Sequence, residues 1–92
     1  MLTIYKYKLN QGRINQIQMP MDASVISVGL DPMEDICIWA IVETDNNMEE
    51  RTFFVAGTGW DITEDLLEFT EISSLGTVRQ GPFMWHIFEG VR

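Results

Sequence analysis

The sequence has very few of the residues on which enzymes and metal sites usually depend. Cysteine and histidine occur once each, as Cys37 and His86. A single thiol cannot form an intramolecular disulfide, and one cysteine with one histidine does not give the ligand spacing that zinc requires. No nucleophile stands in a recognisable motif, and a general base such as histidine normally needs a partner that orients it. The sequence therefore predicts no catalytic residue, no metal site and no cofactor, so we expect a protein that is not an enzyme.

Basic residues and long apolar runs are also scarce. The chain has six Lys and Arg, whereas non-specific binding to a phosphate backbone needs clustered basic residues. No apolar run approaches the roughly 18 residues that a membrane-spanning helix needs. The first residues lack the apolar stretch of a signal peptide, and a lone thiol is typical of a reducing compartment. We therefore expect no nucleic-acid partner, no membrane contact and a cytoplasmic location.

Acidic residues are abundant and unevenly placed. The formal net charge is −8, and residues 31–71 hold twelve acids and one base. Residues 1–30 and 72–92 are mildly basic. The simplest interpretation of the acidic excess is solubility. The alternative is a docking surface for a basic partner protein.

Length and apolar content together constrain the architecture. Ninety-two residues form one domain, residues 1–92. Of these residues, 46% are hydrophobic, which is more apolar surface than one thin sheet can cover. We therefore expect either a closed, barrel-like sheet or a homo-oligomer that buries the remainder.

Alternating or continuous apolar runs, separated by Gly, Pro, Asn and Asp turn signals, predict strands. The expected strands cover residues 3–9, 16–20, 25–30, 36–42, 51–56, 75–79 and 83–88. Residues 36–42 are apolar on both faces, which predicts a central strand buried on both sides and paired in a hairpin with 51–56.

One segment has a helical pattern. A short helix is expected at 62–68, capped by Asp61 with Glu64 in a capping box, and followed by a loop at 73–74. The sequence thus predicts a mainly β protein: a small antiparallel sandwich or barrel-like sheet of about six or seven strands with one short helix.

One short segment stands out as a candidate site. Gly57-Thr58-Gly59-Trp60 ends a predicted strand and leads toward the helix. The glycines are explained either by a tight turn or by the close approach of a ligand on which Trp60 stacks. Arg51 either forms a surface ion pair with Glu49 or Glu50 or, with Arg79, contacts a phosphate. His86 is either a packed histidine or a ligand contact. The candidate ligand-binding residues are Arg51, Gly57, Thr58, Gly59, Trp60, Arg79 and His86.

Several short segments, in their order and spacing, carry a resemblance to a known family. They are Ile4-Tyr5-Lys6-Tyr7, Gln18-Met19-Pro20, Ala23 to Val28, Trp39-Ala40-Ile41-Val42, Gly57-Thr58-Gly59, Gly76-Thr77-Val78 and Trp85-His86-Ile87-Phe88-Glu89. Through them the chain resembles a family of small uncharacterised proteins of tailed bacteriophages and prophages. Two features depart from the family pattern: Trp60 stands where histidine is frequent, and residues 63–74 are longer and more acidic.

The resemblance implies an origin rather than a reaction. A small non-catalytic phage protein in the host cytoplasm is expected to act by binding. It would serve as an accessory protein in counter-defence that sequesters a small nucleotide signal. The alternatives are an acidic inhibitor that binds a host protein, and a minor structural or assembly protein of the virion.

Overall fold

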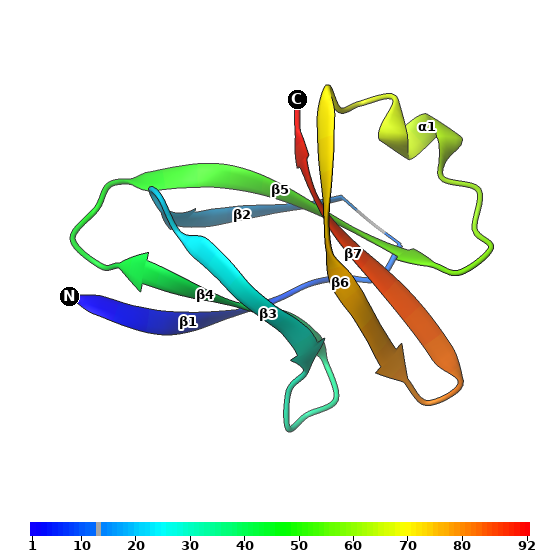
Figure 1. Ribbon diagram of the computed structural model, residues 1–92, viewed down its shortest axis with the longest axis horizontal. Coiled ribbons are helices and arrows are strands. Elements are labelled where there is room, and N and C mark those ends of the chain that lie inside the picture. Colours follow the sequence, from blue (N-terminus) through cyan, green and yellow to red (C-terminus); the bar gives the residue numbers. More distant parts are fainter. Residues whose placement is uncertain (13) are drawn as a thin grey trace.

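The structure, a computed structural model, describes residues 1–12 and 14–92. Within them the chain forms seven strands in two antiparallel sheets and one short helix (Figure 1). The three-stranded sheet has the order β1 (Leu2–Lys8), β4 (Ile36–Glu43), β3 (Ser24–Leu30). The four-stranded sheet has the order β2 (Ile14–Pro20), β5 (Met48–Gly57), β7 (Phe83–Val91), β6 (Glu71–Gln80), and the helix α1 spans Thr63–Leu66. The predicted mainly β, sandwich-like class with one short helix is confirmed.

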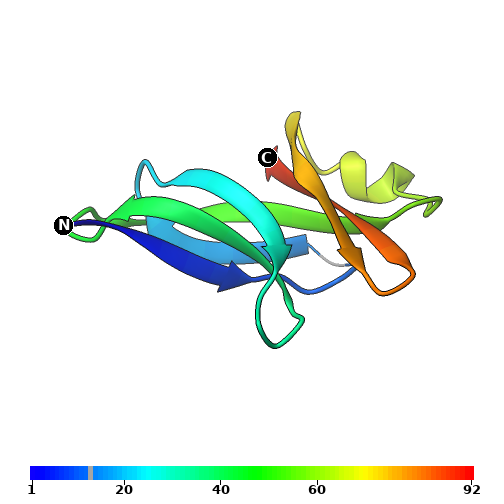
Figure 2. The ribbon, with the colours of Figure 1, turned by 60° about the horizontal axis from the view of Figure 1, so that its bottom comes forward.

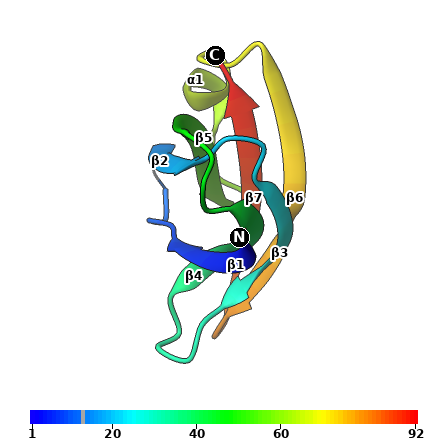
Figure 3. The ribbon, with the colours of Figure 1, turned by 90° about the vertical axis from the view of Figure 1, so that its left-hand side faces the viewer.

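The core lies between the two sheets. In β1 the alternation turns Thr3 and Tyr7 inward and leaves Ile4, Lys6 and Lys8 exposed, as a strand with one buried face requires. The buried apolar cluster comprises Leu9, Met19, Ala23, Ile36, Ile38, Ala40, Val42, Phe53, Val55, Val78, Trp85 and Ile87. Figures 2 and 3 show the two sheets from the side, with β3 lying close to β6.

The strand β4 is central in its sheet, as expected, but it is not buried on both faces. Its inward residues, such as Ile38 and Ala40, are fully buried, whereas Trp39 is half-buried and Ile41 is 40% exposed. The helix α1 and the residues after it do not cover this outer face. They pack on the four-stranded sheet. The ring of Phe69 lies against Gly90, and a Cβ atom at position 90 would be only 2.4 Å from Cδ1 of that ring.

Two expectations about the strands are wrong. The strands β4 and β5 do not form a hairpin, because β4 is already paired on both edges, with β1 and β3. Residues 44–47 therefore carry the chain from one sheet to the other. Ser73 and Ser74 are not a loop, because β7 continues to Val91 and supplies a partner edge for them.

The helix is also shorter than its pattern predicts. The N-cap is Ile62 with no side-chain cap, so the expected capping box from Asp61 to Glu64 is absent. Instead, Asp61 Oδ1 accepts hydrogen bonds from the backbone N–H and the hydroxyl of Thr63, at 3.0 and 2.7 Å. No helix among the described residues has the length and apolar character needed to span a membrane.

The loop between β3 and β4 is held by a buried carboxylate. Asp31, whose side chain is 5% exposed, accepts a hydrogen bond from Lys6 Nζ at 2.7 Å. It also accepts bonds from the backbone N–H groups of Asp35 and Met33, at 3.0 and 2.9 Å. The hydrogen bond from Lys6 has the largest effect. Together these donors lower the pKa of Asp31 from 3.8 to about 2, because each of them stabilises the charged carboxylate.

This carboxylate should make stability depend on pH in a defined direction. Because folding lowers the pKa of Asp31, its contribution is fully present above its ordinary pKa of 3.8 and is lost as the pH falls toward about 2. We expect Asp31→Asn to melt at a lower temperature than the unmodified protein near neutral pH, and the difference to shrink as the pH falls through that window. Thermal melts from neutral to acid pH, with the exposed Glu64→Gln as control, check this. A difference that stays constant down to the lowest pH would contradict it.

Candidate functional site

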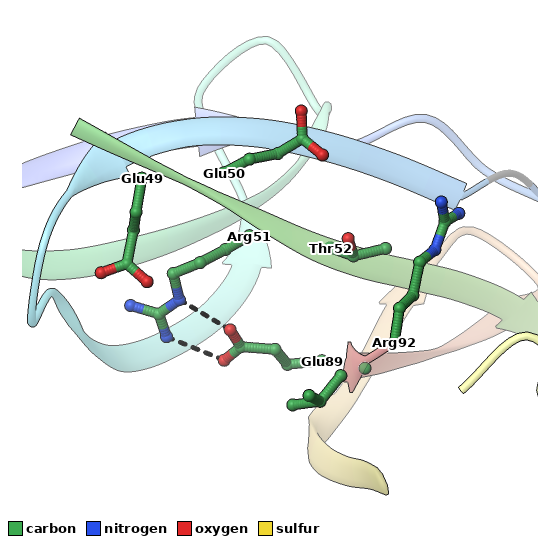
Figure 4. A pocket seen from close by; sticks show the side chains of 8 residues that line it. Glu49, Glu50, Arg51, Thr52, Glu89 and Arg92 are labelled. Carbon is green, nitrogen blue, oxygen red and sulfur yellow. Dashed lines mark hydrogen bonds and ion pairs between the residues drawn. The ribbon is translucent and has the colours of Figure 1, made fainter. Parts of the chain in front are cut away.

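Arg51 lies in a charged pocket of about 340 Å³ between β5 and the end of β7 (Figure 4). Its Nε and Nη2 donate to the two carboxylate oxygens of Glu89, at 2.6 and 2.8 Å, and its Nη1 donates to the carbonyl of Ala23. The expected ion pair with Glu49 or Glu50 is not formed, and Figure 4 shows Glu50 pointing away from the guanidinium. With all three nitrogens engaged, Arg51 serves to join β5, β7 and the turn before β3.

A second hollow, which we call the aromatic hollow, lies where β5 ends beside the start of β7. It has a volume of about 310 Å³ and is lined by Gly57, Thr58, Trp60, Pro82, Phe83, Met84 and Trp85. Trp60 and Phe83 are 49% and 59% exposed, whereas Trp85 is 8% exposed and forms the base. Large apolar side chains that are left this exposed and lie side by side are typical of a binding surface.

Trp60 is held in place by the backbone around it. A Cβ on Gly57 would lie 2.7 Å from the Nε1 atom of Trp60, and a Cβ on Gly12 would lie 2.7 Å from its Cζ3 atom. The indole also meets the ring of Trp85 edge to face, at 5.3 Å between centroids. Glycine at position 57 therefore leaves room for the indole of Trp60. This explanation differs from both of those that the sequence suggested, a tight turn and the close approach of a ligand. The result is a preorganised aromatic platform.

Polar groups adjoin the aromatic hollow on the other face of β7. The hydroxyl of Thr58 lies 2.6 Å from Nε2 of His86, and the hydroxyl of Thr77 lies 3.4 Å from its Nδ1. Arg79 on β6 is opposite Met84, a lining residue. The histidine thus has two hydroxyl partners rather than a carboxylate, which is an arrangement suited to hydrogen bonding more than to general-base catalysis.

Arg79 differs from the other basic side chains that the structure describes. Lys6, Lys8, Arg51 and Arg92 each form an ion pair with a carboxylate. Arg79 donates its Nε to the carbonyl of Gly81 at 3.1 Å and, within residues 1–12 and 14–92, has no acidic partner. Its charge is therefore available to a ligand beside the aromatic hollow.

The fold brings six of the seven candidate residues to this end of the four-stranded sheet. These six are Gly57, Thr58, Gly59, Trp60, Arg79 and His86, whereas Arg51 lines the other pocket. Sequence reasoning missed Phe83, Met84 and Trp85 as lining residues, since it interpreted them only as a strand. One feature of the sequence does point to these residues. Phe83 directly follows the Gly81-Pro82 turn, so it is the first residue of its strand, where an aromatic ring stays exposed.

Acidic side chains gather on the helical segment nearby. Residues 61–71 include Asp61, Glu64, Asp65, Glu68 and Glu71 and no base. Three of them, with Thr63, line a shallow hollow of about 390 Å³. Hydrogen bonds from Thr63 lower the pKa of Asp61. No group of His, Cys, Asp and Glu within the described part of the chain is arranged to hold a metal ion.

Comparison with known proteins assigns a family but no activity. A family model described as "Domain of unknown function (DUF7352)" matches residues 1–92. The chain therefore belongs to this family. No curated protein and no solved structure matches the chain.

Proposed function

We propose that this member of the DUF7352 family is a non-catalytic binding protein whose aromatic hollow takes a small nucleotide-like ligand. The observation that carries the proposal is Trp60, which is 49% exposed yet fixed on two glycines and against Trp85. A rigid, half-exposed indole offers a stacking surface with little loss of conformational freedom on binding.

A flat base and an anionic group together fit the chemistry of this end of the sheet. A base stacked on Trp60 or Phe83 would gain about 1–3 kcal/mol. A phosphate or carboxylate reaching past Met84 would meet Arg79, and a hydrogen bond to a charged group contributes about 1.5–3 kcal/mol. The hydroxyls and imidazole of Thr58, Thr77 and His86 would bind ribose hydroxyls or phosphate oxygens.

The biological setting of this proposal comes from the resemblance to phage and prophage proteins. On that basis the protein would act in the host cytoplasm as an accessory protein and would sequester a nucleotide signal used in counter-defence. Sequestration needs binding alone, which agrees with the hydroxyl-partnered His86.

Native mass spectrometry with a mixture of cyclic dinucleotides, mononucleotides and ADP-ribose derivatives tests the proposal. We expect the protein to gain the mass of one component. Trp60→Ala should then weaken that binding roughly ten- to a hundredfold, because it removes a stacking contact. The matched control is Trp39→Ala, which removes a half-buried tryptophan from the other sheet. A protein that gains no mass, or that loses binding equally in both variants, would overturn the proposal.

Binding of the same ligand by a variant of Arg79 distinguishes the contribution of charge from that of stacking. Arg79→Gln should weaken an anionic ligand by about tenfold or more and leave melting temperature nearly unchanged, since the side chain is exposed. Arg92→Gln, which removes an exposed base paired with Glu68, is the control and should leave binding unchanged. Equal affinity of Arg79→Gln and the unmodified protein would exclude a phosphate contact at Arg79.

The second candidate function is an acidic inhibitor that binds a basic host protein. The five acids of residues 61–71 favour it. Such binding would be strongest at low salt. A partner recovered from host lysate at low salt by the unmodified protein and by Trp60→Ala, but not by Glu64→Lys, would support this function over the nucleotide-binding one.

A further inference from the structure

Gln80, the last residue of β6, joins three separate segments of the chain through one side-chain amide. Its Oε1 accepts a hydrogen bond from the indole N–H of Trp85 at 3.0 Å and another from Nε2 of Gln11 at 3.1 Å. Its Nε2 donates to the carbonyl of Glu34 at 2.9 Å. The base of the aromatic hollow therefore meets the connection between β1 and β2 and the loop between β3 and β4 at this amide.

The partners of Gln80 determine the orientation of its amide. An indole N–H can only donate a hydrogen bond, and a backbone carbonyl can only accept one. The oxygen of Gln80 must therefore face Trp85, and its nitrogen must face Glu34. The carbonyl of Glu34 is itself held in the loop fixed by Asp31, because the Glu34 N–H donates to the Asp31 carbonyl at 2.9 Å. The amide is thus anchored from the three-stranded sheet.

Trp85 is the residue through which this amide acts on the aromatic hollow. Its ring is 8% exposed and lies 5.3 Å from the ring of Trp60 and 5.9 Å from that of Phe83, between centroids. The outer torsion of a tryptophan side chain has only broad preferences, so a hydrogen bond at Nε1 adds a directional constraint. An indole turned away from Gln80 would leave its buried N–H without this acceptor, which is costly. The orientation of Trp85 in turn sets how the two exposed rings stand.

We propose that Gln80 is a positioning residue for the aromatic hollow. Its amide holds the indole of Trp85, and through that indole it holds the exposed rings of Trp60 and Phe83 in the arrangement that a flat ligand ring needs. Gln80 acts through Trp85 rather than by lining the hollow. This inference rests on the proposed function as far as the ligand is concerned, whereas the arrangement of the rings can be measured without a ligand.

Nuclear magnetic resonance spectra of the ligand-free protein test the proposal. The chain has three tryptophans and so gives three indole N–H signals, which Trp→Phe variants assign to Trp39, Trp60 and Trp85. We expect Gln80→Met to speed solvent exchange of the Trp85 indole N–H roughly five- to tenfold, because it removes one hydrogen bond. The Trp60 signal should also shift, since its ring meets that of Trp85. The signal of Trp39, in the other sheet, should stay in place.

Two further variants serve as controls. Gln11→Met removes the second hydrogen bond to the same oxygen and should leave the signals of Trp85 and Trp60 nearly unchanged. In a Trp85→Phe background, Gln80→Met should not shift the Trp60 signal further, because there is no indole N–H left to hold. Unchanged exchange of Trp85 in Gln80→Met, an unchanged Trp60 signal, or an equal shift of the Trp39 signal would overturn the proposal.

The conservative variant Gln80→Glu separates the two ends of the amide. It keeps an acceptor for Trp85 but replaces the donor to Glu34 by a second oxygen. We expect the Trp85 indole N–H to exchange more slowly in Gln80→Glu than in Gln80→Met, while the backbone signals of residues 31–35 shift. Equal exchange in the two variants would mean that an acceptor at this position does not hold the indole, which contradicts the proposal.

Titration with AMP in the same spectra connects the rings to binding. Gln80→Met should raise the dissociation constant of AMP roughly three- to tenfold, because binding must then also order the Trp85 ring. Gln11→Met should bind AMP as the unmodified protein does. Equal affinity of Gln80→Met and the unmodified protein would overturn the positioning role. An unmodified protein that does not bind AMP would count against a mononucleotide as the ligand of the proposed function, while the ligand-free exchange rates would still decide the role of Gln80.

Discussion

Replacing Glu89 with glutamine is expected to destabilise the protein by about 3 kcal/mol, because it leaves the guanidinium of Arg51 without its counter-charge in a largely buried place. The two side chains are only 17% and 21% exposed. Glu89 accepts hydrogen bonds from two of the three guanidinium nitrogens, and this contact raises the pKa of Arg51. The third nitrogen donates to the carbonyl of Ala23, so the pair joins β5, β7 and the turn before β3.

The reverse substitution distinguishes the cost of an unpaired charge from the value of the pair. Arg51→Met alone should be at least as destabilising as Glu89→Gln, since it leaves both a carboxylate and the Ala23 carbonyl without a donor. Arg51→Met combined with Glu89→Leu should recover part of that loss, because replacing both members of a buried pair is often close to neutral.

Urea unfolding of the single and double variants measures these terms. The control is Arg92→Gln, which breaks an ion pair whose side chains are 46% and 52% exposed and should cost at most about 1 kcal/mol. If Glu89→Gln costs no more than Arg92→Gln, then the pair between Arg51 and Glu89 is solvated and does not hold β5, β7 and the turn before β3 together.

The strands could be predicted because the alternation of apolar residues is local. The seven expected strands correspond to the seven that residues 1–12 and 14–92 form, although several boundaries differ by a few residues. The sequence gives much less information about which strands pair with one another. Residues 36–42 and 51–56 are adjacent in sequence and separated by a polar turn, yet β4 and β5 belong to different sheets. A turn sequence does not encode whether the chain returns beside itself or crosses to another layer.

Only the part of the candidate site that is continuous in sequence could be predicted. The segment Gly57 to Trp60 could be recognised from its glycines, but its contact with Phe83, Met84 and Trp85 depends on the register that places Gly57 opposite Trp85. For the same reason Glu89 could not be identified as the partner of Arg51, which lies 38 residues earlier. Glu49 and Glu50 are nearer to Arg51 in sequence, so the sequence alone favours them as its partners.

The largest loss from a single truncation is expected at Phe53. Its side chain is fully buried in the core between the sheets and lies beneath the guanidinium of Arg51, 5.9 Å from the ring centroid. Phe53→Ala should cost about 3–5 kcal/mol, the usual range for removing a buried phenylalanine. Urea unfolding gives the value directly, and the slope of the transition shows whether the compactness of either state has changed.

Trp39→Ala is the informative comparison. Continuous apolar sequence placed Trp39 in a strand buried on both sides, but the side chain lies half-exposed on the outer face of the three-stranded sheet. Its loss should therefore be smaller, about 1–2 kcal/mol, in proportion to the area removed from water. If Trp39→Ala is as costly as Phe53→Ala, the outer face of the three-stranded sheet is not open to solvent at Trp39.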